Sequence, residues 1–331
     1  MLPKPYPGVN MQGLIKQMQI DIDELEKPIP VLNDGFCKYI DHMGTDESIS
    51  QAARVSYAKG TRKVSEDRDL IRFLMRHEHY SPFSMATIKF HLRLPIFIHN
   101  QFIRHDRFHW NMMSGRYSVM PDEKWAPALP EDIRGQGQGN KQVGNGKLDV
   151  EAEEDAFIAI ESANHNSQLN YQELLNLGVC REQARAVLPQ GQYTEGVVTA
   201  NLGDWMLLLK QRLDPHAQLE IQVYAQAIEK ILNELFPICM EAFRDYQLNR
   251  VVLSAAEHEV LMQLLAGKSL RRGPYSAEEL AAAYPQMTAG TEENLEGMRL
   301  QKEQKENEIY LPAILTNKRE REEFIAKFRI D

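Results

Sequence analysis

The segment TIKFHLRLP, residues 87–95, constrains the fold more than any other stretch of this 331-residue chain. Its apolar residues occupy every second position and alternate with Thr, Lys, His and Arg. Successive side chains of a β-strand point to opposite faces, so the pattern predicts a strand with one buried face. Pro95 ends the alternation and can begin a helix. In that helix Gln101, Arg104 and His105 would share one face through their i, i+3 and i+4 spacing.

Helical patterns occupy several other segments. Ser65 is suited to cap a helix that follows it, because acidic residues fill the first turn. Apolar periodicity predicts another helix over residues 150–177. Asp214 followed by Pro215 matches an N-cap and a first helical position. One helix is therefore expected to end near Arg212, and a long amphipathic helix to begin at Pro215.

Three segments flank or interrupt the expected catalytic domain, residues 31–248. Residues 1–30 are rich in proline and are expected to form an N-terminal arm. Residues 130–147 contain five glycines, which predict a flexible loop. Residues 249–331 are expected to form a charged, helical C-terminal extension.

Charge and cysteine content limit the classes of function. The chain has 47 acidic and 38 basic residues, a net charge of −9, so its overall field repels nucleic acid and acidic membranes. An anionic ligand must then meet a local group of basic side chains. Cys37, Cys180 and Cys239 lie far apart without CxxC spacing, which argues against a disulfide framework and indicates a reduced compartment. No export signal or membrane span is expected, so we expect a cytoplasmic protein in which each cysteine is a small buried apolar residue.

The stretch RHDRFHWNMMSGRYS, residues 104–118, concentrates three arginines and two histidines. His105 and His109 have a spacing that could bind a metal, but flanking arginines oppose a divalent cation and the general-base Glu of metalloproteases is missing. No metal is predicted. Any one of these arginines alone could simply be solvated. Several arginines near the ends of apolar elements instead favour an anionic small molecule, held bidentately by Arg104, Arg107, Arg116, Arg185 and Arg212.

Several blocks of the chain, in the same order, resemble the flavin-dependent thymidylate synthase family. They cover roughly residues 31–120 and 178–247. The resemblance implies an α/β (α+β) fold in which helices flank a mixed sheet, and a homotetramer with active sites between subunits. The blocks that carry it are DGFCKYIDHMGTDESISQAARVSYAKG, SEDRDLIRFLMRHEHYSPF, PIFIHNQFIRH, SGRYSVMPDE, CREQARAVLPQGQYTE and NLGDWMLLLKQRLDPHAQLEIQVYAQAI.

The same resemblance implies roles for individual residues. The dUMP contacts would be Gln101, Arg104, Ser114, Gly115, Arg116, Arg185 and Arg212. The FAD contacts would be Ser56, His79, Ser81, Arg104, His105, Asp106, Arg107, Asn111, Asn201 and His216. The catalytic residues would be Arg185, Ser114 and His79, with Arg185 polarising the uracil ring.

Four positions depart from the family pattern. Asp106 stands where the family has an Arg facing the cofactor, and Gly203 and Leu207 replace a frequent Arg and Asn. Met112 replaces the usual Glu on the nucleotide side. Arg107 could supply the charge missing at position 106, or it could pair with Asp106.

The implied reaction is C5 methylation of dUMP to dTMP, with FAD as cofactor and with NADPH and methylenetetrahydrofolate as co-substrates. An alternative is a hydroxymethylase of a pyrimidine nucleotide, which would need no reductant because water would quench the exocyclic methylene. A third possibility is a non-catalytic nucleotide-binding relative. The sequence leaves open uracil or cytosine, and ribose or deoxyribose.

Overall fold

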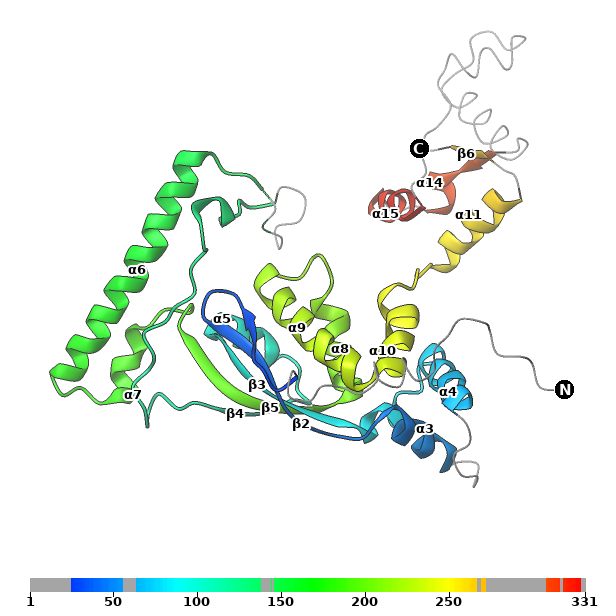
Figure 1. Ribbon diagram of the computed structural model, residues 1–331. Coiled ribbons are helices and arrows are strands. Elements are labelled where there is room, and N and C mark those ends of the chain that lie inside the picture. The colour runs from blue at the N-terminus through cyan, green and yellow to red at the C-terminus, as the bar shows by residue number, and fades with distance from the viewer. Residues whose placement is uncertain are drawn as a thin grey trace, which may run out of the picture. The chain divides into compact units, whose positions relative to one another are not determined.

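The chain divides into two compact units, residues Met1–Arg250 and Val251–Asp331. The computed structural model describes residues 25–55, 64–137, 144, 146–266, 269–271, 308–315 and 318–328. Each unit is described by itself (Figure 1). Ser56, residues 1–24 of the expected arm and most of residues 267–307 lie outside these ranges.

A five-stranded sheet forms the centre of the described part of the first unit. Its order is β1 (Ile29–Val31), β2 (Gly35–Met43), β3 (Thr87–Pro95), β5 (Tyr193–Asn201) and β4 (His109–Met112). All neighbouring pairs run antiparallel. The α+β class and a sheet covered by helices are confirmed, but the mixed sheet that we expected is an antiparallel one.

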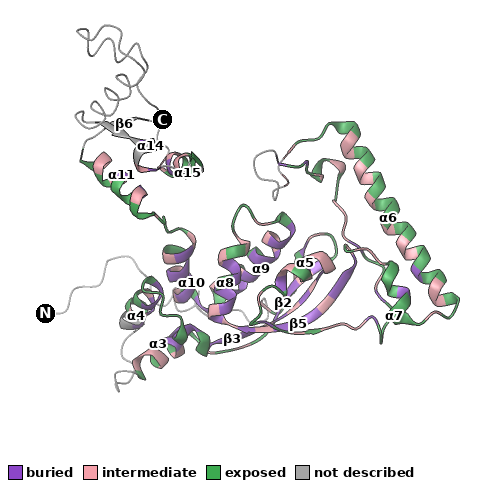
Figure 2. Cartoon of the chain, turned by 180° about the vertical axis from the view of Figure 1, so that it is seen from behind, coloured by how far each residue is buried: buried purple, intermediate pink, exposed green. Residues whose placement is uncertain are grey.

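The strand predicted over residues 87–95 is confirmed as β3, and its alternating pattern separates a buried face from a partly exposed one. Ile88, Phe90, Leu92 and Leu94 are fully buried. Helices α5 (Ile96–Phe102), α8 (Leu202–Arg212) and α9 (Leu219–Leu235) cover this face, as both ribbon views show (Figures 1 and 2). The α8 residue Trp205 anchors the layer, because its ring packs against Phe90 and its Nε1 donates to the Ile88 carbonyl at 3.3 Å.

Five further helices and helical turns close the end of the sheet near residue 87. They are α3 (Asp46–Arg54), α4 (Val64–Arg76), the 3₁₀ turn η2 (Ser81–Met85), α10 (Pro237–Phe243) and the π-helical turn η5 (Arg244–Leu248). The Asp46 carboxylate accepts from the backbone N–H groups of Ile238 and Cys239 at 2.9 and 3.0 Å. These two hydrogen bonds cap α10, because the first N–H groups of a helix have no partner within the helix.

A second apolar cluster lies around the long helix α6 (Val150–Asn176), which confirms the helix predicted over residues 150–177. After α6 come α7 (Arg181–Ala184) and the 3₁₀ turn η4 (Arg185–Val187). Tyr171 and Ala184 are fully buried there. The Tyr171 hydroxyl accepts from the Met120 N–H at 3.1 Å and so ties α6 to the segment after β4.

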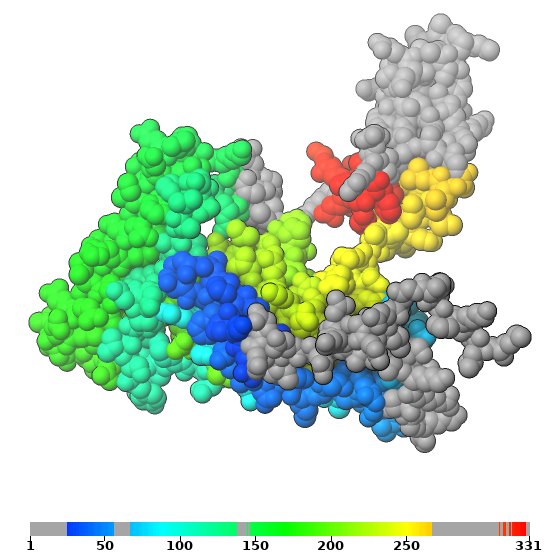
Figure 3. Space-filling model, viewed as in Figure 1, coloured from blue at the N-terminus to red at the C-terminus, as the bar shows by residue number. Residues whose placement is uncertain are grey.

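The glycine-rich segment 130–147 has structure at both of its ends. It begins with the 3₁₀ turn η3 (Pro130–Asp132), and Gly135 and Gly146 exchange backbone hydrogen bonds of 2.9 and 3.0 Å. Residues 138–143 and 145 lie outside the described ranges. Residues 125–128, which lead into the glycine-rich segment, lie beside the turn between β1 and β2. In Figure 3 this part of the chain is blue-green and lies against the blue of the first strands. Together with the start of α9, these segments line a cavity of about 960 Å³.

Three predicted helix boundaries are wrong. Ser65 does not cap α4 but lies within it, because the helix already includes Val64. Helix α5 ends at Phe102, so Arg104 and His105 lie in the turn after it and not on its face. Helix α9 begins at Leu219 and not at Pro215. Asp214 caps a separate turn instead, because its carboxylate accepts from the His216 N–H at 2.8 Å. The predicted end of α8 at Arg212 is confirmed.

The second unit contains α11 (Ala255–Leu265), β6 (Ser269–Arg271), β7 (Glu308–Tyr310), α14 (Leu311–Ile314) and α15 (Lys318–Phe328). Strands β6 and β7 pair in parallel. The prediction of a helical extension did not include this pair of strands. Val260, Leu311, Leu315 and Phe324 form its small core. In neither unit does a described helix combine the length and the apolar character needed to cross a bilayer.

Candidate functional site

Arg212, the last residue of α8, is held in a fixed position by two neighbours. Its Nε donates to His105 Nε2 at 3.3 Å, and its Nη2 donates to the Gln101 carbonyl at 3.3 Å. The arrangement follows from the local fold: α5 ends at Phe102, and the turn after it brings His105 against the end of α8. Three residues from distant segments thus form one cluster, which we call the Arg212 cluster.

His105 is neutral at ordinary pH. Burial is the largest cause, and the charge of Arg212 the next, of a pKa lowered from 6.5 to about 4, while the adjacent Asp106 carboxylate acts in the opposite direction. A neutral imidazole can accept the hydrogen bond from Arg212, whereas an imidazolium could not. Burial also lowers the pKa of Arg212 from its usual value, but the guanidinium remains charged at physiological pH. The cluster therefore presents one partly desolvated positive charge.

The cluster continues to the start of α9. Gln101 Nε2 donates to Gln218 Oε1 at 2.6 Å. Exposed His216 lies in the intervening turn, where its Nδ1 lies 2.9 Å from Asp214 Oδ1. Gln218 also lines the 960 Å³ cavity, so that cavity borders the Arg212 cluster.

A second group, the Ser114 group, combines the loop after β4 with α7 and η4. Ser114 Oγ accepts from the Arg116 N–H at 3.3 Å. Gly115 is buried, and a Cβ added there would lie 3.1 Å from Arg185 Cδ and 2.8 Å from Met120 Sδ. A Cβ at this position would require the Met120 side chain to shift, and its absence leaves room for Arg185 beside residues 114–116. Among the described residues, the exposed Arg185 side chain has no hydrogen-bond or ion-pair partner.

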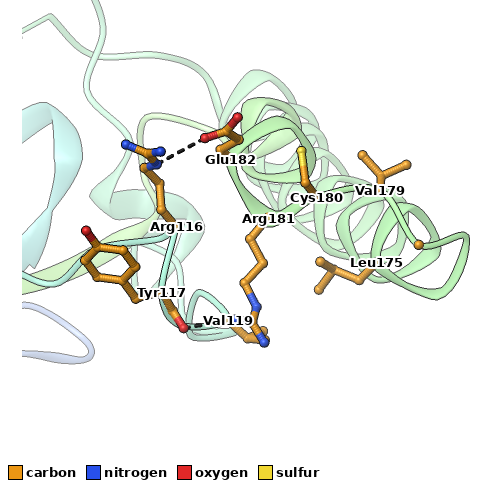
Figure 4. Close-up of a pocket in the computed structure, with 9 residues that line it drawn as sticks. Arg116, Tyr117, Val119, Leu175, Val179, Cys180, Arg181 and Glu182 are labelled. Carbon is orange, nitrogen blue, oxygen red and sulfur yellow. Dashed lines mark hydrogen bonds and ion pairs between the residues drawn. The ribbon is translucent and has the colours of Figure 1, made fainter.

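Arg116 points toward α7 and pairs with Glu182 at 3.1 Å (Figure 4). In the same view Arg181 donates to the Tyr117 carbonyl at 3.0 Å. These residues line a cavity of about 500 Å³ together with Cys180. Cys37 and Cys239 are buried as expected, but Cys180 is exposed because it precedes α7 at the surface.

A third group, the Asn201 group, surrounds the start of α8. Asn201 caps the helix by accepting from the Asp204 N–H at 2.9 Å, and its Nδ2 donates to Asp204 Oδ2 at 2.5 Å. Arg107 Nη1 lies 3.3 Å from Asp204 Oδ1. Arg107 therefore pairs with Asp204 and not with its neighbour Asp106, which is exposed. The turn η2, which begins at Ser81, packs against α8.

The remaining predicted residues lie apart from these groups. Arg104 is exposed, and Asn111 is exposed on β4, where its backbone pairs with Val197. His79 is exposed just before η2, and its ring lies 6.1 Å from that of Phe73. Within the described residues, no hydrogen bond or ion pair joins the Ser114 group to the Arg212 cluster. The described ranges also hold no set of three or more His, Cys, Asp or Glu side chains placed to bind a metal ion.

Three residues of these groups were missed from the sequence. Asp204 stands three residues after Asn201, a spacing typical of a helix cap and its third position, and that spacing was a usable signal. Gln218 and Glu182 had no comparable sequence signal, because an isolated Gln or Glu in a polar stretch is typical of solvated surface.

Comparisons with known proteins identify the family. The sequence model of Thy1, described as thymidylate synthase complementing protein, matches residues 38–238. A flavin-dependent thymidylate synthase of Thermus thermophilus is 43% identical over 72% of this chain and 86% of its own length. Proteins of the same name from Gluconobacter oxydans and Wolbachia pipientis are 40% and 36% identical over 73% and 78% of this chain, and over 81% and 90% of their own lengths.

A solved structure is similar as well. The UMP/dUMP methylase PolB of Streptomyces cacaoi, crystallised with 5-Br dUMP, is 29% identical, with a TM-score of 0.61 over 66% of this chain and 99% of that one. The same methylase with 5-Br UMP gives a TM-score of 0.59. The match to the family model and the identities to its members agree: this chain belongs to the Thy1 family of flavin-dependent thymidylate synthases.

Proposed function

We propose that this protein methylates C5 of dUMP to give dTMP, with methylenetetrahydrofolate as one-carbon donor and NADPH as reductant. The observation that carries the proposal is the Arg212 guanidinium, partly buried and held by His105 and Gln101. A cation fixed in this way can face the uracil carbonyls without reorganising during the reaction, which is the requirement for stabilising charge that develops in a transition state.

The geometry favours Arg212 over Arg185 for polarising the ring. Arg212 is partly buried and hydrogen-bonded, whereas Arg185 is exposed and has no partner among the described residues. Arg185 is better suited to the nucleotide phosphate, together with Arg104 and Arg116. Ser114 and the Gly115 backbone would bond the ribose or phosphate, and Gln101 would orient the base. His79, our third candidate for catalysis, would line the reaction space.

The residues around the start of α8 fit a flavin nucleotide. Arg107 and Lys210 supply positive charge there, and Tyr80 and Ser84 supply hydroxyl groups. Ser81, Asn201, His105 and His216 are further candidate FAD contacts, as are Arg104, Asp106, Asn111, His79 and Ser56. Bound FAD would supply the hydride that reduces the transferred one-carbon unit. The chain's own residues would bind and orient the reactants and exclude water.

A homotetramer would complete the site. The Ser114 group and the Arg212 cluster both carry arginines for one nucleotide, yet no described hydrogen bond or ion pair connects them. A second subunit could supply the Ser114 group to the Arg212 cluster of the first. The free cysteines among the described residues fit a reduced, cytoplasmic compartment.

The test is product analysis. Purified protein is incubated with dUMP, methylenetetrahydrofolate, NADPH and FAD, and the nucleotide product is identified by mass spectrometry. We expect dTMP that depends on both FAD and NADPH, and parallel reactions with UMP and dCMP define the accepted nucleotide. Hydroxymethylated product formed without NADPH would overturn the proposal in favour of a hydroxymethylase. Binding of dUMP without turnover would indicate a non-catalytic relative.

A further inference from the structure

Gln218 is the N-cap residue of α9, but its side chain does not cap that helix. Ser, Thr, Asp and Asn are preferred at an N-cap, because their short side chains bond the free N–H groups of the first turn. Gln218 instead reaches across to α5, where its Oε1 accepts from Gln101 Nε2 at 2.6 Å. Departures from local structural preference are expected at functional sites. The Gln218 side chain therefore serves its contact with Gln101 and not the helix that it begins.

Gln101 is tied to both ends of the turn that joins α8 to α9. Its backbone carbonyl accepts from Arg212, the last residue of α8, at 3.3 Å. Its side-chain amide donates to Gln218, the residue before the first turn of α9. The backbone bond fixes where Gln101 lies relative to the Arg212 guanidinium, and the side-chain bond fixes which way its amide is turned.

The direction of the Gln101 amide decides which hydrogen bond it offers to a bound base. An amide has a nitrogen that donates and an oxygen that accepts. Because Nε2 is turned to Gln218, Oε1 is the group left for a ligand. The neighbouring Arg212 guanidinium has donors only. An acceptor beside donors matches uracil, whose N3–H stands between two carbonyl oxygens, and it does not match cytosine, whose N3 carries a lone pair.

We propose that Gln218 is a positioning residue that acts through Gln101 and sets the preference of the site for uracil over cytosine. Gln218 holds the Gln101 amide with Oε1 toward the base. With the amide turned around, Nε2 would face N3–H of uracil, and two donors would oppose each other. The proposal rests on one part of the proposed function, the binding of a pyrimidine nucleotide beside Arg212 and Gln101. It goes beyond that function by assigning the choice of base to a residue that does not itself contact the nucleotide.

The test is calorimetric titration of the full-length protein with dUMP and with dCMP. The two nucleotides share sugar and phosphate, so the ratio of their Kd values cancels effects on the phosphate and on overall charge. The unchanged protein should bind dUMP about tenfold or more tightly than dCMP, since a mismatched hydrogen bond costs about that much. Gln218→Glu should keep the ratio, because a carboxylate only accepts. Gln218→Lys should lower the ratio by about tenfold, because an ammonium only donates and would turn the Gln101 amide around.

Gln218→Ser separates positioning from a structural role. Ser is a preferred N-cap, so the melting temperature should stay the same or rise. The dUMP preference should nevertheless fall by about threefold or more, because the Gln101 amide is free to turn. Gln222→Leu is the matched control at the same helix end. Gln222 Nε2 donates to the Ala217 carbonyl at 2.6 Å, so its loss should lower the melting temperature and leave the ratio unchanged.

The outcomes distinguish this inference from the proposed function. Gln218 is exposed, so its three variants should fold, and their melting temperatures confirm it. If the ratio stays unchanged in Gln218→Lys or in Gln218→Ser, or if Gln218→Glu loses it, the inference is wrong and the proposed function stands. Equal affinity of the unchanged protein for dUMP and dCMP would also overturn the inference. If dUMP binds but is not methylated, the proposed function fails while the ratios still test Gln218. If neither nucleotide binds, both fail.

Discussion

The neutral state of His105 depends partly on the charge of Arg212, and Arg212→Gln would make this dependence measurable. Burial is the largest cause of the lowered His105 pKa, and Arg212 is the next. Two unit charges about 4 Å apart interact by roughly 1 to 2 kcal/mol if the effective dielectric constant of this partly buried pair is about 40 to 80. Since about 1.4 kcal/mol changes a pKa by 1, we expect the His105 pKa to rise from about 4 to about 5.

The same change alters stability at acid pH. The folded-state pKa of His105 lies below the unfolded value of about 6.5, so the unfolded chain binds this proton more tightly. The contribution of neutral His105 to stability is thus present above about pH 6.5 and is lost as the pH falls toward 4. In Arg212→Gln, the stability that neutral His105 contributes should already be lost near pH 5. The total amount lost should be smaller than in the unchanged protein.

The measurement is an NMR titration of the imidazole resonances. The chain has ten histidines, so the spectrum of His105→Gln assigns the signal. Arg212→Lys is the control, because it keeps the positive charge and should leave the pKa near 4. If the pKa of His105 stays near 4 in Arg212→Gln as well, burial alone keeps the ring neutral, and the electrostatic description of the Arg212 cluster is wrong.

Further predictions concern the other groups. Arg185→Ala should weaken dUMP by at least about thirtyfold in calorimetry, the effect of leaving a ligand charge unpaired, with an unchanged melting temperature because the side chain is exposed. Equal binding would remove Arg185 from the site. Gly115→Ala should cost about 1 to 3 kcal/mol in chemical denaturation, because the new Cβ would lie 2.8 Å from Met120 Sδ; full stability would show that Met120 moves away freely. Asp106→Arg should change FAD affinity by less than about fivefold, since exposed charges contribute only about 0 to 1 kcal/mol, and a hundredfold gain would contradict this. Arg134→Gln should destabilise the protein by about 1 to 3 kcal/mol, because it leaves the buried Glu220 carboxylate without its cation; an unchanged melting curve would show that the pair contributes nothing.

The sequence predicted elements whose pattern is set by one-sided burial. The strand at residues 87–95 and the helix at 150–177 are confirmed, because their periodicity records which face meets the core. The antiparallel pairing of the sheet was not predicted, since alternation along one strand says nothing about the direction of its neighbours. Asp214 and Pro215 matched a helix start, but they form a tight turn before α9, because local capping signals are shared by turns and helices.

The candidate site was predicted as a list of residues and not as an arrangement. Arg212, His105 and Gln101 do come together, which resemblance alone could not establish. The pairing of Arg107 was left open between two outcomes, and its partner Asp204 was not among them. That partner is distant in sequence, so no local pattern could indicate it.

The order of strands in the sheet has a consequence for synthesis of the protein. β3 pairs with β2 on one side and with β5 on the other, and β5 leaves the ribosome only after the whole of α6. Until then β3 has an open edge and an apolar face that only α5 can cover, since α8 and α9 follow β5. An open strand edge next to apolar surface is a template for pairing with other chains. The nascent chain therefore passes through an aggregation-prone interval whose length is set by the segment between β3 and β5, and slower translation of that segment would prolong its dependence on chaperones.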